Sequence, residues 1–400
     1  MQKYLWIGGY LDDYLKKDII ENNGKIMSSY ISQKNIFDGI EKNSTIVFDS
    51  INSLRLEHYP KYKKLFIKKH VWSHQKSAID VYVGYLNLKY LAIKLKTITL
   101  KRECRKWANK NKNKKVTVFV FGMHSPYMVS AKIIKKIIPN TKLVLINPDL
   151  PQFMDGNQSV IKKILKRIDG YTINKTFKLF DKHILYSKYM ADALKIDKKN
   201  WIVMEGSINL EKKFNYIKKQ DNNKFIVMYS GVIGKMYGTV NLIKSILELG
   251  DEYELWLFGT GDLDEYTKKI AQTHNNIKFF GYCNDSNILY QYQRNSSVLI
   301  TLIDPYSPVS NYCFPSKIFE YLMSGNPVIS TKINGIPNEY FEYLIPIENN
   351  ESETISKAIK EVKNMTQEER DKIGKKGKEF ISKNKNIDVQ AKKIIDFINS

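Results

Sequence analysis

One acidic side chain stands out in the stretch PSKIFEYLMSGNPVIST, which runs from residue 315 to residue 331. Proline and serine at its start, with Ser316 as the N-cap, predict a short helix that ends at the Ser-Gly-Asn-Pro segment. The helix dipole disfavours Lys317 in the first turn unless an anion lies near it. Apolar residues cover much of this helix, so we expect Glu320 at a packed, ligand-facing edge. The alternative is a helix with one solvated acid.

Glycine follows many of the apolar runs, at positions where a ligand could approach the backbone closely. These glycines are Gly8, Gly9, Gly122, Gly231, Gly234, Gly259, Gly261 and Gly281. Those of the second half favour a nucleotide cleft, although tight turns also need glycine for their own geometry. Lys235 stands where a glycine-rich turn meets a helix, so it is a candidate clamp for a diphosphate. One more solvated lysine is the alternative.

The elements that must position these residues follow from an alternation of short apolar runs with longer helical patterns. Near-continuous apolar strands between helices indicate parallel sheets that are covered on both faces. The predicted strands are 3–9, 44–50, 115–122, 142–148, 183–187, 200–206, 224–231, 254–261, 277–282, 296–302 and 326–331. The fold class is therefore α/β, with two Rossmann-like doubly wound domains facing a cleft.

The polar segment 209–224 gives the best domain boundary, because several strand–helix units lie on each side of it. We expect an N-terminal Rossmann-like domain over 1–208 and a C-terminal nucleotide-binding domain over 209–385. A final helix over 386–400 would pack back on the N-terminal domain. Ligands bind at the carboxyl ends of strands in such sheets, so the glycines and helix starts at those ends form the expected site.

Composition limits the class of protein. The net charge of +23 predicts a surface that attracts phosphates of nucleic acid, anionic lipid or small molecules, although genomic bias can explain part of the lysine excess. Cys104, Cys283 and Cys313 show no metal spacing and no disulfide framework, which favours a reducing cytosol. No apolar run approaches the roughly 20 residues of a membrane span, and the N-terminus is typical of a first strand.

The segment SVIKKILKRIDG, residues 159–170, has the pattern of a basic amphipathic helix. Its apolar residues fall on one face, and Lys162, Lys163, Lys166 and Arg167 fall on the other. Such a helix suits the surface of an anionic membrane, and a core-packed helix with solvated lysines is an equal alternative.

The stretch around Glu320, with GIPNEY after it, resembles the nucleotide-binding signature of retaining glycosyltransferases with the GT-B fold. SGVIGKMYG, LWLFGTGD and IKFFGYCND are similar to C-terminal segments of the same family, in the same order and spacing. FVFGMHSPYM and PDLPQFMD resemble the N-terminal domain of its capsule and exopolysaccharide members, which are family 4-like. The resemblance covers most of the chain and is strongest over 224–340.

The resemblance implies roles for the matching residues. Glu320 would hold the ribose hydroxyls of a sugar nucleotide, because a carboxylate can accept two hydroxyl hydrogen bonds. Lys235, Lys317 and helix-start amides would hold the diphosphate, and the base would lie against Gly281 and Tyr282.

The chain also departs from this family. Many relatives carry a glutamate eight residues before the ribose glutamate, where this chain has Tyr312. Relatives also carry arginine and lysine in the glycine-rich turn, where this chain has Val232 and Tyr237, so Lys235 must substitute. The Asp-Leu-Asp segment 262–264 resembles a metal-binding motif of another glycosyltransferase fold, but it stands at a helix start, where acids cap the helix. We therefore predict no metal.

In the first domain, the resemblance matches His124 to the histidine near the donor sugar and the acceptor, with a structural histidine as the alternative. The implied activity is retaining transfer of a sugar from a nucleotide diphosphate to a hydroxyl of a lipid-linked glycan, in cell-surface polysaccharide synthesis. No cofactor is expected, and the protein would be peripheral on the cytoplasmic face of the plasma membrane. Alternatives are a GT-B epimerase or phosphorylase, a non-catalytic relative, and a nucleic-acid binder, for which the sequence has no recognition motif.

Overall fold

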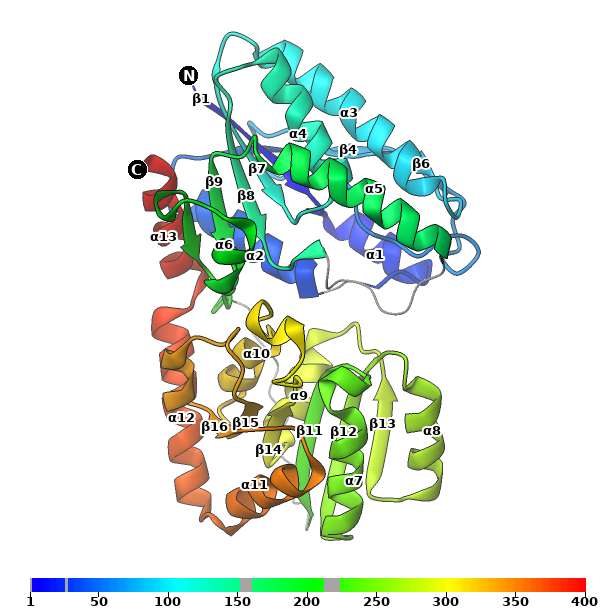
Figure 1. Cartoon of the computed structure of the whole chain (residues 1–400), viewed down its shortest axis with the longest axis vertical. Helices are drawn as coiled ribbons and strands as arrows, with labels where there is room; N and C mark the ends of the chain where they lie inside the picture. The colour runs from blue at the N-terminus through cyan, green and yellow to red at the C-terminus, as the bar shows by residue number, and fades with distance from the viewer. Residues whose placement is uncertain (1, 26–27, 152–159, 212–223) are drawn as a thin grey trace. The chain divides into compact units, whose positions relative to one another are not determined.

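The computed structural model describes residues 2–25, 28–151, 160–211 and 224–400, without the side chains of residues 28 and 160–166. By contact, the chain divides into two units. Unit 1 holds Met1–Glu205 and Gln390–Ser400, and unit 2 holds Gly206–Val389. Most of the expected boundary segment 209–224 lies outside the described residues. Each unit contains a mainly parallel sheet covered by helices, which confirms the predicted α/β class (Figure 1).

Unit 1 is built on a sheet in which all strands are parallel except β4, at one edge (Figure 1). In sheet order the strands are β10 (Trp201–Val203), β9 (Lys182–Leu185), β8 (Lys142–Asn147), β7 (Lys115–Phe121), β1 (Gln2–Gly8), β2 (Phe48–Asn52), β5 (Asp80–Tyr82) and β4 (His70–Trp72). A separate antiparallel pair joins β3 (Phe66–Ile67) to β6 (Tyr85–Leu86).

The helices of unit 1 complete its layers. They are α1 (Asp13–Glu21), α2 (Ser28–Lys42), α3 (Ala92–Asn111), α4 (Ser125–Ile137), α5 (Val160–Phe177), α6 (Tyr189–Leu194) and α13 (Ile387–Asn399). Helices α3, α4 and α5 pack in a row (Figure 1). Helix α13 packs on the same unit, because Lys142 Nζ donates to the Ile398 carbonyl at 2.6 Å and Lys182 Nζ lies 4.6 Å from the centroid of the Phe397 ring.

Unit 2 has a parallel sheet with the order β13 (Ile277–Gly281), β12 (Tyr253–Thr260), β11 (Phe225–Val232), β14 (Val298–Thr301), β15 (Val328–Thr331) and β16 (Ile345–Ile347). Its helices are α7 (Thr239–Leu249), α8 (Asp264–Thr273), α9 (Ser286–Asn295), α10 (Lys317–Ser324), α11 (Ser352–Asn364) and α12 (Gln367–Asn384). All eleven predicted runs overlap strands or their ends, whereas the short strands β3 to β6 and β16 were not predicted.

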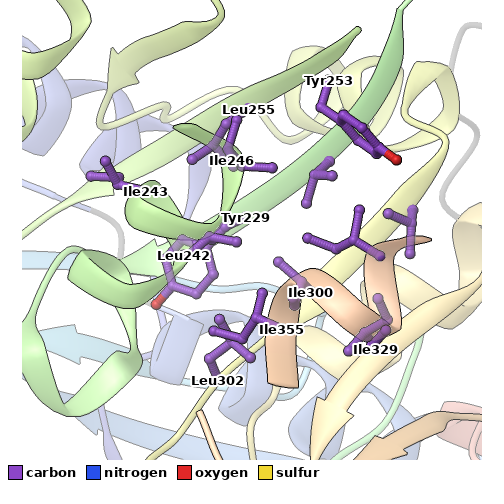
Figure 2. Packing of buried hydrophobic residues seen from close by; sticks show 14 of the residues in the cluster. Tyr229, Leu242, Ile243, Ile246, Tyr253, Leu255, Ile300, Leu302, Ile329 and Ile355 are labelled. Carbon is purple, nitrogen blue, oxygen red and sulfur yellow. The ribbon is translucent and has the colours of Figure 1, made fainter. Parts of the chain in front are cut away.

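Alternate residues along the strands of unit 2 enter two hydrophobic cores, one on each face of the sheet. On β11, Val227 and Tyr229 enter one core and Met228 enters the other. Figure 2 shows the first core, where Leu242 of α7 and Ile355 of α11 gather with the strand residues. Because both faces are covered, the ends of the strands are where a ligand can reach this sheet.

An ionic cluster near strands β2, β4 and β5 of unit 1 was not anticipated from the sequence. His74 lies between two carboxylates, with Nδ1 2.7 Å from Asp80 Oδ2 and Nε2 3.1 Å from Glu41 Oε2. Its backbone N–H donates to the same Asp80 oxygen at 2.9 Å. Burial alone would lower the pKa of His74, but the hydrogen bonds to Asp80 and Glu41 outweigh it and raise the pKa to about 9.

This cluster predicts a pH dependence of stability. The pKa of His74 in the folded state exceeds the value of about 6.5 for an unfolded histidine, so its contribution is complete below about pH 6.5 and is lost as the pH rises through about 9. The full contribution is on the order of 3 kcal/mol. In urea unfolding, the wild type should therefore lose more stability across this interval than His74→Gln. His274→Gln, in unit 2, should keep the wild-type slope, and equal slopes for all three proteins would contradict the assignment.

Candidate functional site

The order of strands reverses once in each sheet, and the carboxyl ends of the strands beside the reversal form a crevice for ligands. In unit 2 the reversal falls between β11 and β14. Two segments leave the sheet at this point: the stretch 231–235, where β11 ends and turns, and the chain from β14 that reaches α10 at residues 316–320. We call these two segments the unit 2 edge.

Glu320 lies in the first turn of α10, on the side that the core leaves uncovered. The buried residues of this helix are Ile318, Phe319, Tyr321, Leu322 and Ser324. Glu320 Oε2 lies 2.9 Å from Lys317 Nζ and 3.5 Å from Gln293 Nε2, and the side chains of Lys317 and Glu320 are both partly buried. The one acid of this helix is therefore paired with the lysine that the sequence had assigned to a diphosphate.

The side chain of Tyr321 fixes α10 against the glycine turn. Its hydroxyl accepts a hydrogen bond from the Ser230 N–H at 2.7 Å and donates to the Ser230 carbonyl at 3.1 Å. Because Ser230 precedes Gly231 in β11, these bonds set the distance between Glu320 and the turn. Ser316 occupies the N-cap position of α10, but its backbone is already helical and its side chain makes no capping hydrogen bond.

Lys235 is exposed and begins a 3-10 turn, Lys235–Tyr237, that precedes α7. The Gly234 N–H donates to Thr239 Oγ1 at 3.0 Å, so the first residue of α7 holds this turn. At Gly238, where φ is +69°, a side chain would lie 2.6 Å from Leu302 Cβ, and only glycine fits. The turn is therefore folded tightly onto the start of α7, with the ammonium group of Lys235 in solvent.

The glycines of the unit 2 sheet serve two different purposes. A Cβ atom on Gly259 would lie 1.7 Å from the Gly231 carbonyl oxygen, and one on Gly261 would lie 2.1 Å from that of Ile233. These two glycines let β12 approach β11 closely, so they have a structural explanation. Gly281 has a φ of +68° and nothing within 4 Å of its ideal Cβ, so it leaves open space at the carboxyl end of β13.

Other predicted site residues lie on segments that leave the same end of the sheet. Tyr282 directly follows β13 and is partly buried, and burial raises its pKa. Tyr312 lies between β14 and α10, where its N–H donates to the Val309 carbonyl at 2.9 Å. Val232 is exposed at the end of β11, and Tyr237 packs against both cores. Sheet topology thus brings Tyr282 and Tyr312 to the edge that holds Glu320.

One acid of the segment 262–264, Asp264, holds a turn. Asp264 Oδ1 accepts from the Gly261 N–H at 2.7 Å, and Thr260 Oγ1 donates to Asp264 Oδ2. Asp264 is the first residue of α8, where a carboxylate also complements the helix dipole. Within the described ranges, no group of three or more histidine, cysteine, aspartate and glutamate residues is placed to hold a metal ion.

In unit 1 the strand order reverses between β1 and β7, which places the segment after β1 beside the segment after β7. Gly8 ends β1, and Gly9 begins the segment after it. The Gly9 N–H donates to Gln33 Oε1 at 2.7 Å, and a Cβ on Gly9 would lie 2.4 Å from Leu54 Cδ2. The side chains of Gln33 and Leu54 therefore fill the space beside these two glycines.

His124 occupies the N-cap position of α4, in the segment after β7, where the backbone of Gly122 has a φ of +86°. Its Nε2 atom is buried and has no hydrogen-bond partner among the described residues. Burial, with the nearby charges of Lys96 and Arg55, lowers the pKa of His124 to about 3. The imidazole is therefore neutral at physiological pH and can offer one nitrogen to a ligand as a donor or an acceptor.

The predicted basic helix is part of α5. The side chains of Lys162, Lys163 and Lys166 lie outside the described residues. Arg167 is exposed, and so are two large side chains beyond it, Ile168 at 60% and Tyr171 at 69%. The described end of this helix thus presents apolar surface to solvent next to a cation.

The glycine geometry gives a prediction. Gly259→Ala should destabilise unit 2 by more than about 3 kcal/mol, because the new methyl group meets the Gly231 carbonyl and nothing there can yield. Gly281→Ala should cost about 1–2 kcal/mol, since it meets open space and bears only the strain of a left-handed backbone. Urea unfolding followed by circular dichroism measures both values, and equal losses would contradict this distinction.

We compared the chain with protein-family models, curated proteins and solved structures. Residues 211–380 match the family model described as Glycosyl transferases group 1. No curated protein matches the chain. Among solved structures, Anabaena HepE in complex with UDP and glucose has a TM-score of 0.66 at 13% identity and covers 100% of both chains.

Two further structures show the same fold. Sucrose-phosphate synthase from Thermosynechococcus elongatus has a TM-score of 0.72 at 13% identity, over 99% of this chain and 98% of that chain. The lipopolysaccharide outer core galactosyltransferase WaaB has a TM-score of 0.63 at 12% identity, over 100% of this chain and 99% of that chain. The chain therefore has the GT-B fold of two Rossmann-like domains, and its residues 211–380 are similar to the glycosyl transferases group 1 family.

Proposed function

We propose that the protein is a retaining glycosyltransferase of the capsule or exopolysaccharide type. It would transfer a sugar from a nucleotide-diphosphate sugar to a hydroxyl group of a lipid-linked glycan. The observation that carries this proposal is Glu320, a partly buried carboxylate at the unit 2 edge, in the region that matches the glycosyl transferases group 1 model. The UDP and glucose bound to HepE support a sugar nucleotide as the donor.

In this proposal the ion pair at Glu320 is rearranged when the donor binds. The carboxylate would accept hydrogen bonds from the ribose hydroxyls, and Lys317, now 2.9 Å from it, would turn to the diphosphate together with Lys235. Cations placed where the leaving group gains charge lower the barrier strongly. The departing diphosphate can take the proton of the acceptor hydroxyl, so the proposal includes neither a strong side-chain base nor a metal.

The test is transfer from a broad panel of sugar nucleotides to lipid-linked acceptors. We expect release of nucleoside diphosphate, an unchanged rate in EDTA, and retained configuration at the anomeric carbon of the product by NMR. In the same assay, Glu320→Ala should weaken donor binding roughly ten- to a hundredfold, because hydrogen bonds to a charged group are each worth about 1.5–3 kcal/mol.

Glu248→Ala is the matched control, because Glu248 also pairs with a lysine on a helix of unit 2, Lys244 at 3.6 Å. It should bind the donor as the wild type does. Absence of both hydrolysis and transfer across the panel would overturn the proposed activity. Unchanged donor affinity in Glu320→Ala would overturn only the role of that residue.

We also propose that the protein works on the cytoplasmic face of the plasma membrane, attached mainly through unit 1. In the part of the chain that the structure describes, no helix is long and apolar enough to cross a bilayer. Support for a peripheral contact comes from exposed apolar side chains among lysines and arginines. On α3, which packs in one row with α4 and α5, Ile93 and Ile98 are each 54% exposed. On α5, Ile168 and Tyr171 are exposed beyond Arg167.

Sedimentation with liposomes tests this attachment. Binding should rise with the anionic lipid content, fall with salt, and drop when Lys162, Lys163, Lys166 and Arg167 are changed to Glu, since each basic residue near an anionic surface contributes about 1 kcal/mol. The control changes Lys372, Lys375, Lys376 and Lys383 of α12 to Glu, which removes the same net charge from unit 2. Equal loss in both variants, or no binding of the wild type to fully anionic vesicles at low salt, would contradict the proposal.

A further inference from the structure

A buried lysine that the sequence did not single out lies at the carboxyl edge of the unit 1 sheet, in the neighbourhood of His124. Lys96, on α3, is only 4% exposed. Its Nζ donates to the Leu54 carbonyl at 3.1 Å and lies 5.5 Å from the centroid of the Tyr85 ring. Among the described residues, these are its polar and aromatic contacts, and no carboxylate pairs with it. An ammonium group has three donors, so this environment leaves most of its hydrogen-bonding capacity unused.

Two polar atoms without hydrogen-bond partners among the described residues lie in the same part of unit 1 as Lys96. The loop 53–55 follows β2, and the hydroxyl oxygen of Ser53 is buried without a hydrogen-bond partner in the described chain. Tyr127 connects the loop to α4, because its hydroxyl donates to the Ser53 carbonyl while its ring packs edge-on against the His124 ring, 5.0 Å between centroids. Nε2 of His124 is the second of these unpartnered atoms.

The charge of Lys96 reaches His124, and the charge of Arg55 reaches both residues. Burial lowers the pKa of Lys96 to about 8, with a further lowering from Arg55, and the charges of Lys96 and Arg55 both lower the pKa of His124. Arg55 is exposed, at the rim of the cluster. A buried cation without an acid costs several kcal/mol unless a negative group compensates it. The described residues supply no such group, whereas a bound anion would compensate the charge of Lys96 and give a partner to the Ser53 hydroxyl and to His124 Nε2.

We infer that Lys96, His124 and Ser53 form an anion site at the carboxyl edge of the unit 1 sheet, with Arg55 at its rim, which takes a carboxylate or phosphate group of the acceptor. The inference that the anion belongs to the acceptor rests on the proposed transferase function. The site itself does not, because it is defined by the buried cation and the two polar atoms around it. An acidic sugar or a sugar phosphate at the acceptor end is the substrate class that fits.

The test observes the histidine directly and needs no turnover. Protein labelled with 15N-histidine is titrated with sodium glucuronate and, separately, with inorganic phosphate, at constant ionic strength. The chain has six histidines, and His124→Gln identifies the relevant signals. We expect a saturable shift of the His124 imidazole signals with at least one of the two probes. Lys96→Met should abolish this shift, and Ser53→Ala, which removes no existing hydrogen bond of that hydroxyl, should weaken it several-fold.

Lys94→Met is the matched control, because Lys94 is exposed on the same helix and the substitution removes the same charge. It should leave the shift intact. The inference is overturned if neither probe moves the His124 signals, or if Lys94→Met abolishes the shift as fully as Lys96→Met, which would indicate general attraction to a basic surface. A shift with UDP but with neither small anion would place His124 beside the donor and would also overturn it. Loss of sugar transfer alone, with anion binding intact, would count against the proposed function and not against this site.

Discussion

The two hydrogen bonds between the Tyr321 hydroxyl and the backbone of Ser230 are the contact on which the unit 2 edge depends. Through them Tyr321, in the middle of the short helix α10, contacts strand β11 just before its glycine turn. The register of α10 against β11 then sets where Glu320 and Lys317 stand. A buried hydroxyl that both donates and accepts is costly to leave unsatisfied, so the helix has little freedom to slide. The position of the carboxylate is therefore determined by the core and not by the loop.

The two sheet edges hold their charges in opposite ways. At the unit 2 edge, Lys235 is in solvent and Lys317 already has a carboxylate beside it, so both charges are inexpensive before any ligand arrives. At the carboxyl edge of the unit 1 sheet, Lys96 is buried, and no carboxylate among the described residues pairs with it. Charge interactions are weak in water and strong in a buried setting. A ligand group that binds beside buried Lys96 is therefore discriminated by its charge more strictly than one that binds beside solvent-exposed Lys235.

Much of the fold could be predicted because its signals are local. The long, nearly continuous apolar runs predict parallel strands, and glycine and proline predict where many of the elements end. Strands β4 and β5 carry no such signal, since each is three residues long and Asp80 lies within one of them. The position of Glu320 on the less buried side of its helix could be predicted, because the apolar residues of that helix mark the buried side. The partners of His74 come from positions 41 and 80, and nothing near Lys96 in the sequence separates it from the other lysines of the chain. Such clusters exist only once the topology has brought distant residues together.

The packing of α13 on unit 1 has a consequence for the order in which the protein is made. Residues Gln390–Ser400 belong to unit 1, yet all of Gly206–Val389 is synthesised before them. At roughly 5–20 residues per second, the first unit waits on the order of ten to forty seconds for its last helix. Until then Lys142 lacks the Ile398 carbonyl and Lys182 lacks the Phe397 ring. The unit that leaves the ribosome first is thus the one that is completed last.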